Sequence, residues 1–135
     1  MAGYSGTPLA KKLGIKSGFI LKIINQPDDF FDFFEEFPEN ITFEDSPETL
    51  KDVIHFFTME VKNLHSTLKQ LKTEIKQNGM IWVSWPKKAS KVPTDVNEDI
   101  IRGFALETGL VDVKVCAVSK IWSGLKLVIP VKDRK

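Results

Sequence analysis

The apolar run Met80–Val83 is the feature that most constrains the fold of this chain. Its four residues do not alternate with polar ones, which is typical of a strand buried on both faces. Asn78-Gly79 before it can close a preceding helix, because glycine adopts the left-handed conformation of a helix C-terminus without steric cost. Pro86 ends the strand, since proline has no N–H to donate to a neighbouring strand. A strand buried between two layers predicts an α/β domain.

Further strand-like and helical segments alternate along the chain. Strands are expected at 19–24, 41–43, 53–57, 80–83, 111–118 and 125–131. Helices are expected within 4–14, at 28–37, for about one turn from Ser46, from 61 to the Asn78-Gly79 turn, and from 94 or 95 to 108. With right-handed crossovers, this order predicts a three-layer, mostly parallel Rossmann-like sheet of about six strands that ends in an antiparallel hairpin.

Length and composition indicate a single domain over residues 1–135, with 1–14 as an N-terminal arm and short helix. The one cysteine, Cys116, lies in an apolar run, so we expect a buried, inert thiol and no intramolecular disulfide. The chain begins without a signal-peptide pattern and has no apolar run of membrane-spanning length. These features predict a cytoplasmic protein that does not bind membranes.

Local patterns refine two of the helices. The phenylalanines of segment 28–37 follow helical spacing, so we expect a core-facing aromatic stripe rather than a ligand site. Asp95 and Glu98 are spaced as in a capping box at the start of the helix that follows. His55 is expected in the core and His65 on the solvated surface, and the pattern of cysteines and histidines predicts no metal site.

The net charge of +1 conceals two segments of opposite charge. Residues 28–48 hold nine carboxylates and no lysine or arginine, at Asp28, Asp29, Asp32, Glu35, Glu36, Glu39, Glu44, Asp45 and Glu48. Lysines gather later, at Lys62, Lys69, Lys72, Lys76, Lys87, Lys88 and Lys91. A total charge near zero argues against a dedicated nucleic-acid binder, whereas the segregation can orient a charged partner.

Several segments resemble known families. The helix ending at Asn78-Gly79 with Met80–Val83, and the stretches from Gly109 and from Gly124, resemble the Rossmann-like fold of S-adenosylmethionine-dependent methyltransferases, shortened by about one strand-helix unit. Segments 4–16, 82–91, 109–118 and 122–126 resemble a small bacterial family of uncharacterised proteins. The first resemblance implies the fold and a possible methyl-donor site, while the second implies no assigned activity.

The loop after the first strand departs from a nucleotide-binding loop. Such a loop needs glycines, so that the backbone can approach the ligand, and a helix N-terminus facing it. Here it reads Asn25-Gln26-Pro27, in which proline lacks an amide donor and two side chains occupy the space that a ligand needs. Glu44, about twenty residues further on, is placed as a ribose-binding carboxylate would be. Asn25, Gln26 and Glu44 are thus the only cofactor candidates, and we expect no cofactor.

Three functions remain open. The sequence favours a non-catalytic binding or regulatory module on a degenerate methyltransferase-like scaffold, with an unknown protein or small anionic ligand as partner. Its expected contact surface consists of Trp85, Lys87, Lys88, Lys91 and Trp122, although the sequence does not decide whether the tryptophans lie in the core or on the surface. The alternatives are an S-adenosylmethionine- or nucleotide-dependent enzyme with an atypical site, and a weak nucleic-acid or anion binder through the 85–91 loop.

Overall fold

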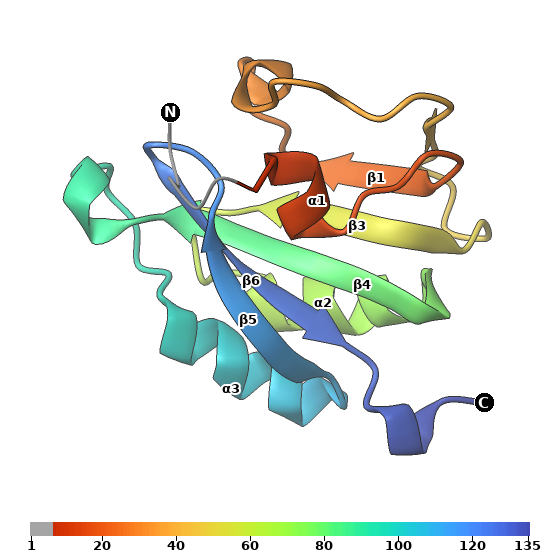
Figure 1. Ribbon diagram of the computed structural model, residues 1–135. Helices are drawn as coiled ribbons and strands as arrows, with labels where there is room; N and C mark the ends of the chain where they lie inside the picture. The colour runs from red at the N-terminus through yellow and green to blue at the C-terminus, as the bar shows by residue number, and fades with distance from the viewer. Residues whose placement is uncertain (1–6) are drawn as a thin grey trace.

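The computed structural model describes residues 7–135, which form one mixed sheet with helices on both faces. The strands are β1 (Ile20–Ile24), β2 (Thr42–Phe43), β3 (Lys51–Phe57), β4 (Ile75–Pro86), β5 (Val111–Ala117) and β6 (Trp122–Val128). Their order in the sheet is β2-β1-β3-β4-β6-β5 (Figure 1). The first four strands are mutually parallel, and β6 runs antiparallel to both β4 and β5. The predicted α/β sheet with a closing antiparallel hairpin is confirmed.

Each face of the sheet has its own apolar core. Helices α2 (Leu64–Lys72) and α3 (Glu98–Thr108) pack on one face, here called the α2/α3 face, against residues such as Ile54 and Ile81. Helix α1 (Leu9–Leu13) and the 3-10 turn η1 (Phe30–Phe33) cover the other, the α1 face, against Val53 and Trp82. In Figure 1, α2 and α3 lie below the sheet, α1 lies in front of it, and the orange coil of η1 lies above β1. The central strands β3 and β4 are therefore buried on both sides, as their continuous apolar runs predict.

Helix α1 is tied to the centre of the sheet. The indole Nε1 of the fully buried Trp82 donates a 2.9 Å hydrogen bond to the carbonyl of Leu13. Gly14 ends the helix in the left-handed conformation, with φ 74°, as the sequence predicts. The first six residues of the expected N-terminal arm lie outside the described residues.

The start of β4 corrects the prediction for Asn78-Gly79. Helix α2 already ends at Lys72, and the strand begins at Ile75 and runs through both residues, so they do not cap a helix. A β-carbon on Gly79 would lie 3.0 Å from the carbonyl oxygen of Lys51, so glycine serves here to let two strands approach closely. The pairing of Ile75 with Lys51 outcompetes the local helix signal.

The predicted helix over 28–37 is also wrong. Only the four residues of η1 are helical, and Phe34 is already extended, with φ −106° and ψ 134°. The irregular backbone lets several rings surround the buried Phe30, whose centroid lies 5.1 Å from that of Phe31 and 5.2 Å from that of Phe34. Phenylalanine and aspartate have low helix propensity, so little stability is lost when this segment does not form a helix. The packing of the aromatic rings stabilises the irregular backbone instead.

Smaller corrections concern element boundaries. Asn97, not Asp95, caps α3 by accepting a hydrogen bond from the amide of Ile100, and Asp95 instead accepts one from the amide of Val61. The chain after Ser46 forms a hydrogen-bonded turn rather than a helix. Strand β6 begins at Trp122, three residues earlier than predicted, because residues 122–124 pair with the end of β4. The bond from Val61 to Asp95 and the pairing of β6 with β4 join segments that are distant in sequence.

Candidate functional site

The sheet has one topological switch point, between β1 and β3. From β1 the chain moves outward to β2 and then returns to β3, on the other side of β1, before continuing to β4. In open α/β sheets, ligands bind beyond the carboxyl ends of the strands at such a point. The residues that follow β1, β3 and β4 therefore define the candidate site: 25–27, 58–60 and 87–91.

Asn25 bridges the two strand ends at the switch point. Its side-chain amide donates a 2.9 Å hydrogen bond to the carbonyl oxygen of Phe57, the last residue of β3. Its backbone is left-handed, with φ 58°, a conformation that asparagine tolerates better than most residues do. The exposed side chain thereby lies across the ends of β1 and β3, the region where a nucleotide or methyl donor binds in ligand-binding versions of this fold.

The rest of the loop after β1 does not present a set of free backbone N–H groups to a ligand. Gln26 is exposed, and the carbonyl of Pro27 is bonded to the amide of Phe30 at 3.0 Å. The segment that follows is a single 3-10 turn, so no α-helix presents free N–H groups and a positive dipole end to a ligand. The loop after β1 therefore has neither the glycines nor the following α-helix that hold a nucleotide in this fold.

Glu44 follows β2, but it does not reach the loop after β1. Its amide donates to the carbonyl of Leu21 at 2.8 Å, which places it beside Lys22, two residues or roughly 7 Å before the end of β1. Its carboxylate accepts a 3.0 Å hydrogen bond from the amide of Ser46 and so organises its own turn. The structure does not bring Glu44 together with Asn25 and Gln26.

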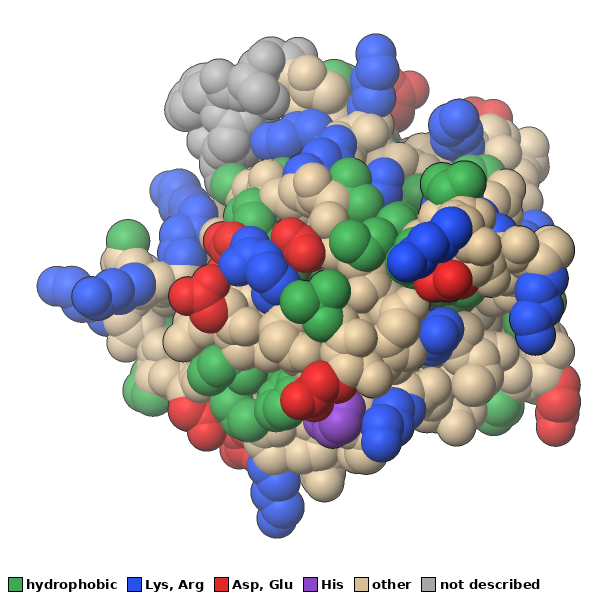
Figure 2. Space-filling model, turned by 90° about the horizontal axis from the view of Figure 1, so that it is seen from below, with side chains coloured by type: hydrophobic (Ala, Val, Ile, Leu, Met, Phe, Trp, Pro, Cys, Tyr) green, Lys and Arg blue, Asp and Glu red, His purple; other side chains and the backbone are tan. Residues whose placement is uncertain are grey.

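The basic loop after β4 lies at the same edge of the sheet. It contains the 3-10 turn η2 (Lys88–Ser90), and the amide of Lys87 donates a 2.8 Å hydrogen bond to Ile121 from the loop before β6. Lys88, Lys91 and Lys120 are exposed, and Ile121 is 40% exposed. Figure 2, a view of the α2/α3 side, shows basic side chains projecting at its left edge, the end where η2 lies in Figure 1.

The two tryptophans do not belong to one surface. Trp85 is buried among the residues of the α2/α3 face, whereas the half-buried Trp122 packs on the α1 face with its ring centroid 5.0 Å from that of Phe57. The sheet itself separates them, since Trp122 pairs with Pro86 and Trp85 with Ser123. Of the predicted contact surface, only Lys87, Lys88 and Lys91 remain together and accessible.

A buried histidine–serine pair lies on the α1 face. The Nε2 of His55 is 2.7 Å from the Oγ of Ser84, and both residues are almost fully buried, as predicted for His55. Its Nδ1 has no hydrogen-bond partner among residues 7–135, and burial lowers the pKa of the imidazole from 6.5 to about 3, so the ring is neutral near pH 7. A substrate cannot reach a serine that is 0% exposed, so this pair is part of the core. Ser84 follows an apolar run, and no local pattern indicates its contact with His55.

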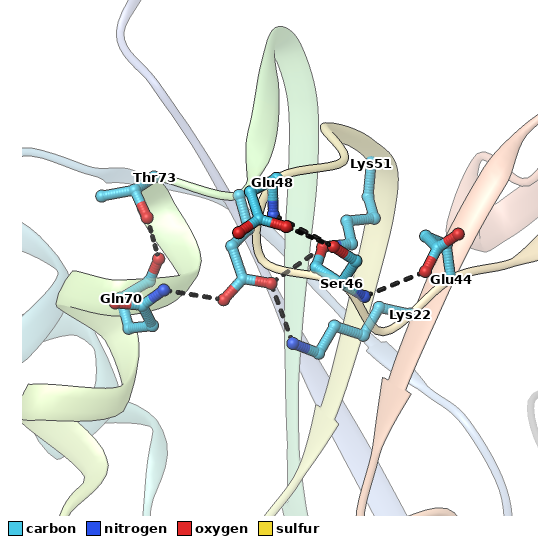
Figure 3. A network of polar contacts seen from close by, with 8 residues as sticks. Lys22, Glu44, Ser46, Glu48, Lys51, Gln70 and Thr73 are labelled. Carbon is cyan, nitrogen blue, oxygen red and sulfur yellow. Dashed lines mark hydrogen bonds and ion pairs between the residues drawn. The ribbon is translucent and has the colours of Figure 1, made fainter.

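The sequence also missed a buried ionic network at the opposite, amino-terminal edge of the strands. Figure 3 shows it around Lys22, Lys51 and Gln70, each of which donates to the Glu74 carboxylate, Lys22 at 2.8 Å and Lys51 at 2.9 Å. Lys51 also donates to the carbonyl of Ser46. Burial alone would raise the pKa of Glu74, but these hydrogen bonds lower it to about 2.

The remaining predicted chemistry is modest. Cys116 is half-buried, and burial raises its pKa, so its thiol is poorly nucleophilic. His65 is not simply solvated, because it stacks on Phe104 with ring centroids 5.0 Å apart.

Among residues 7–135, no group of three metal-ligating side chains is close enough to hold an ion. No helix in the same range is long and apolar enough to cross a membrane.

A comparison with protein families identifies the family of this chain. Residues 10–131 match the family described as "Protein of unknown function (DUF3052)". The chain belongs to this family. No curated protein matches the sequence. Membership covers nearly the whole chain, as the resemblance in the four sequence segments implies, and it carries no assigned activity.

Solved structures confirm the fold. A protein from Sulfolobus solfataricus described as a type 11 methyltransferase superposes with a TM-score of 0.66 at 13% identity, over 98% of this chain and 96% of that one. A methyltransferase from Aquifex aeolicus gives 0.56 at 13% identity, over 90% and 87%. Aeropyrum pernix fibrillarin, which contains bound S-adenosyl-L-methionine, gives 0.58 at 11% identity, over 89% and 73%. At these identities the likeness establishes the methyltransferase-like fold alone.

Proposed function

We propose that this chain is a non-catalytic binding module that retains a methyltransferase-like scaffold without its methyl-donor site. The observation that carries the proposal is the hydrogen bond from Asn25 to Phe57, by which the chain's own side chain joins the two strand ends at the switch point. The 3-10 turn after β1 and the withdrawn Glu44 support it, because each replaces a feature that holds a nucleotide in this fold. The buried His55–Ser84 pair offers no accessible base or nucleophile in its place.

Titration with S-adenosylmethionine tests this proposal. We expect no measurable heat at millimolar ligand in isothermal calorimetry, because a bound ligand would have to displace Asn25 and pay for an unsatisfied carbonyl at Phe57. A methyltransferase of known affinity, titrated in the same buffer, is the positive control. Saturable binding with a micromolar dissociation constant would contradict the proposal and would favour the alternative, an S-adenosylmethionine-dependent enzyme with an atypical site.

A second candidate function is weak binding of an anionic polymer through the basic loop. The observation that favours it is the bond between Lys87 and Ile121, which joins two loops into one exposed projection at the carboxyl edge. Lys87, Lys88 and Lys91 form no ion pair with any residue in 7–135, so their charges are available to a partner. An exposed projection with three lysines suits the phosphates of a nucleic acid without specifying its base sequence.

The polymer candidate is tested with a fluorescently labelled single-stranded oligonucleotide. Three phosphate contacts predict a slope of about −2 to −3 in a plot of log affinity against log salt concentration. We expect replacement of Lys87, Lys88 and Lys91 with alanine to abolish binding, measured by fluorescence anisotropy. The matched control replaces the exposed Lys62, Lys69 and Lys132 and should bind as the wild type does. Equal losses in both variants would show only an effect of net charge and would exclude this surface.

A further inference from the structure

A pocket of about 370 Å³ lies on the α1 side of the molecule, and its lining contains none of the residues that follow β1, β3 or β4 at the switch point. One wall comes from α1 and the turn after it, and the other comes from the segment that follows η1. The lining residues are Pro8, Ala10, Lys11, Gly14, Ile15, Lys16, Glu36, Phe37, Pro38 and Glu39. The volume lies at the lower end of the range for small-molecule sites, about 300 to 1,000 Å³.

The apolar part of this pocket is held in place by the core. Ile15 is 5% exposed, and the ring of Phe37 lies between Phe34, at 5.0 Å between centroids, and Phe43, at 6.1 Å. Gly14 closes α1 in a left-handed conformation and sets the angle of the wall. The pocket floor is therefore preformed, so a ligand would not need to order it.

The charged part divides into two rims of opposite sign. Lys11 and Lys16 stand on the α1 wall, and Glu36 and Glu39 on the facing wall. All four side chains are exposed, and none forms an ion pair with another residue in the described part of the chain. The pocket thus has two positive and two negative groups on either side of an apolar floor.

We propose that this pocket binds a small zwitterion with an apolar side chain, which is the chemistry of a free apolar amino acid or a short peptide. The carboxylate of the ligand bonds to the lysine rim, its ammonium group bonds to the glutamate rim, and its side chain covers Phe37 and Ile15. A ligand with only one charge would leave one rim without a partner. The ligand's two charges match both rims at once, and charge-assisted hydrogen bonds are stronger than neutral ones.

This inference does not depend on the proposed function, because the pocket shares no residue with the switch point or the basic loop. A failure of either test leaves the other standing. If both hold, the binding module would respond to a small metabolite at one site and meet a partner at another.

Titration of the isotopically labelled protein, followed by amide shifts in NMR spectra, tests the pocket. The probes are L-phenylalanine, the dipeptide L-alanyl-L-phenylalanine, N-acetyl-L-phenylalanine without the ammonium group, and L-phenylalaninamide without the carboxylate. We expect saturable shifts at residues 11–16 and 36–39 with a zwitterion, and binding about tenfold weaker for each singly charged analogue. The tighter of the two zwitterions identifies a free amino acid or a peptide as the source.

Two double variants then test which group of the ligand each rim binds. Glu36→Gln combined with Glu39→Gln should weaken L-phenylalanine about tenfold and leave N-acetyl-L-phenylalanine unchanged, since the latter has no ammonium group. Lys11→Gln combined with Lys16→Gln should weaken L-phenylalanine and leave the amide unchanged. The controls Glu35→Gln and Lys12→Gln each remove one charge of the same sign from a neighbouring residue outside the pocket, and they should have no effect on binding. The proposal would be overturned if the zwitterions and the singly charged analogues bound equally well. It would also be overturned if none of the probes produced a saturable shift.

Discussion

As the pH is lowered from 6.5 to 3, the free energy of unfolding is expected to fall by about 4 kcal/mol through His55 alone. The imidazole is surrounded by Phe30 and Phe57, and the Phe57 ring stacks on it with centroids 4.1 Å apart. Its one polar partner is the hydroxyl of Ser84. Burial without a compensating carboxylate disfavours the charged form and so lowers the pKa to about 3.

The sign follows from proton linkage. Below pH 6.5 the unfolded chain binds a proton at this residue, whereas the folded chain does not bind one until the pH approaches 3. The contribution is therefore fully present above pH 6.5 and is lost at about 1.4 kcal/mol per pH unit on acidification. Between pH 6.5 and 4.5 the loss precedes the titration of most carboxylates, so this interval isolates the histidine.

Urea unfolding at a series of pH values measures this effect. The variant His55→Gln keeps an amide that can bond to Ser84 but does not titrate, so its stability should stay nearly constant from pH 6.5 to 4.5. His65→Gln is the matched control and should retain the wild-type slope. The imidazole pKa of the wild-type protein, followed directly by NMR, gives a second readout if His55→Gln folds poorly. An imidazole that titrates near pH 6.5 in the folded protein would contradict this prediction.

Replacement of Glu74 by glutamine is expected to lower the free energy of unfolding by about 3 to 5 kcal/mol near pH 7. Lys51 is fully buried, and its ammonium group has the Glu74 carboxylate as its one charged partner among residues 7–135. Glutamine keeps the size of the side chain but leaves that charge uncompensated in the core. The lowered pKa of Glu74 also predicts a pH dependence. The stability that its carboxylate contributes is present above pH 4.5 and is lost as the pH falls from 4.5 to about 2.

Two further variants separate the charge effect from packing. The double variant Lys51→Met with Glu74→Leu removes both buried charges and should recover much of the stability lost in Glu74→Gln, because a buried ion pair contributes little over an apolar pair of similar volume. Glu48→Gln removes an exposed carboxylate in the neighbouring turn and should change stability by less than about 0.5 kcal/mol. A double variant less stable than Glu74→Gln would show that the network is net stabilising.

Much of the fold could be predicted from the sequence because the central strands are buried on both faces. Segments such as 53–57 and 80–83 must then be continuously apolar, and turn residues such as Gly14 and Gly109 have few alternatives to a left-handed helix end. The absence of glycines from the loop after β1 is likewise a property of the sequence itself.

The rest could not be predicted, because it depends on which residues meet across the sheet. The helix signal before Asn78-Gly79 was outweighed by the pairing of Ile75 with Lys51, and the aromatic stripe of 28–37 was rearranged around Phe30. The position of Trp85 was decided by the side of the strand on which α2 and α3 pack.

The sequence by itself determined that this chain forms a mostly parallel α/β sheet with a closing hairpin and lacks a glycine-rich loop, since burial and backbone freedom are written residue by residue. Only the tertiary structure decided that Asn25 reaches Phe57, that Ser84 meets His55, and that Lys11 and Lys16 line one pocket with Glu36 and Glu39. The physical reason is that these contacts join segments far apart in the chain, and no local preference specifies which distant segments become neighbours.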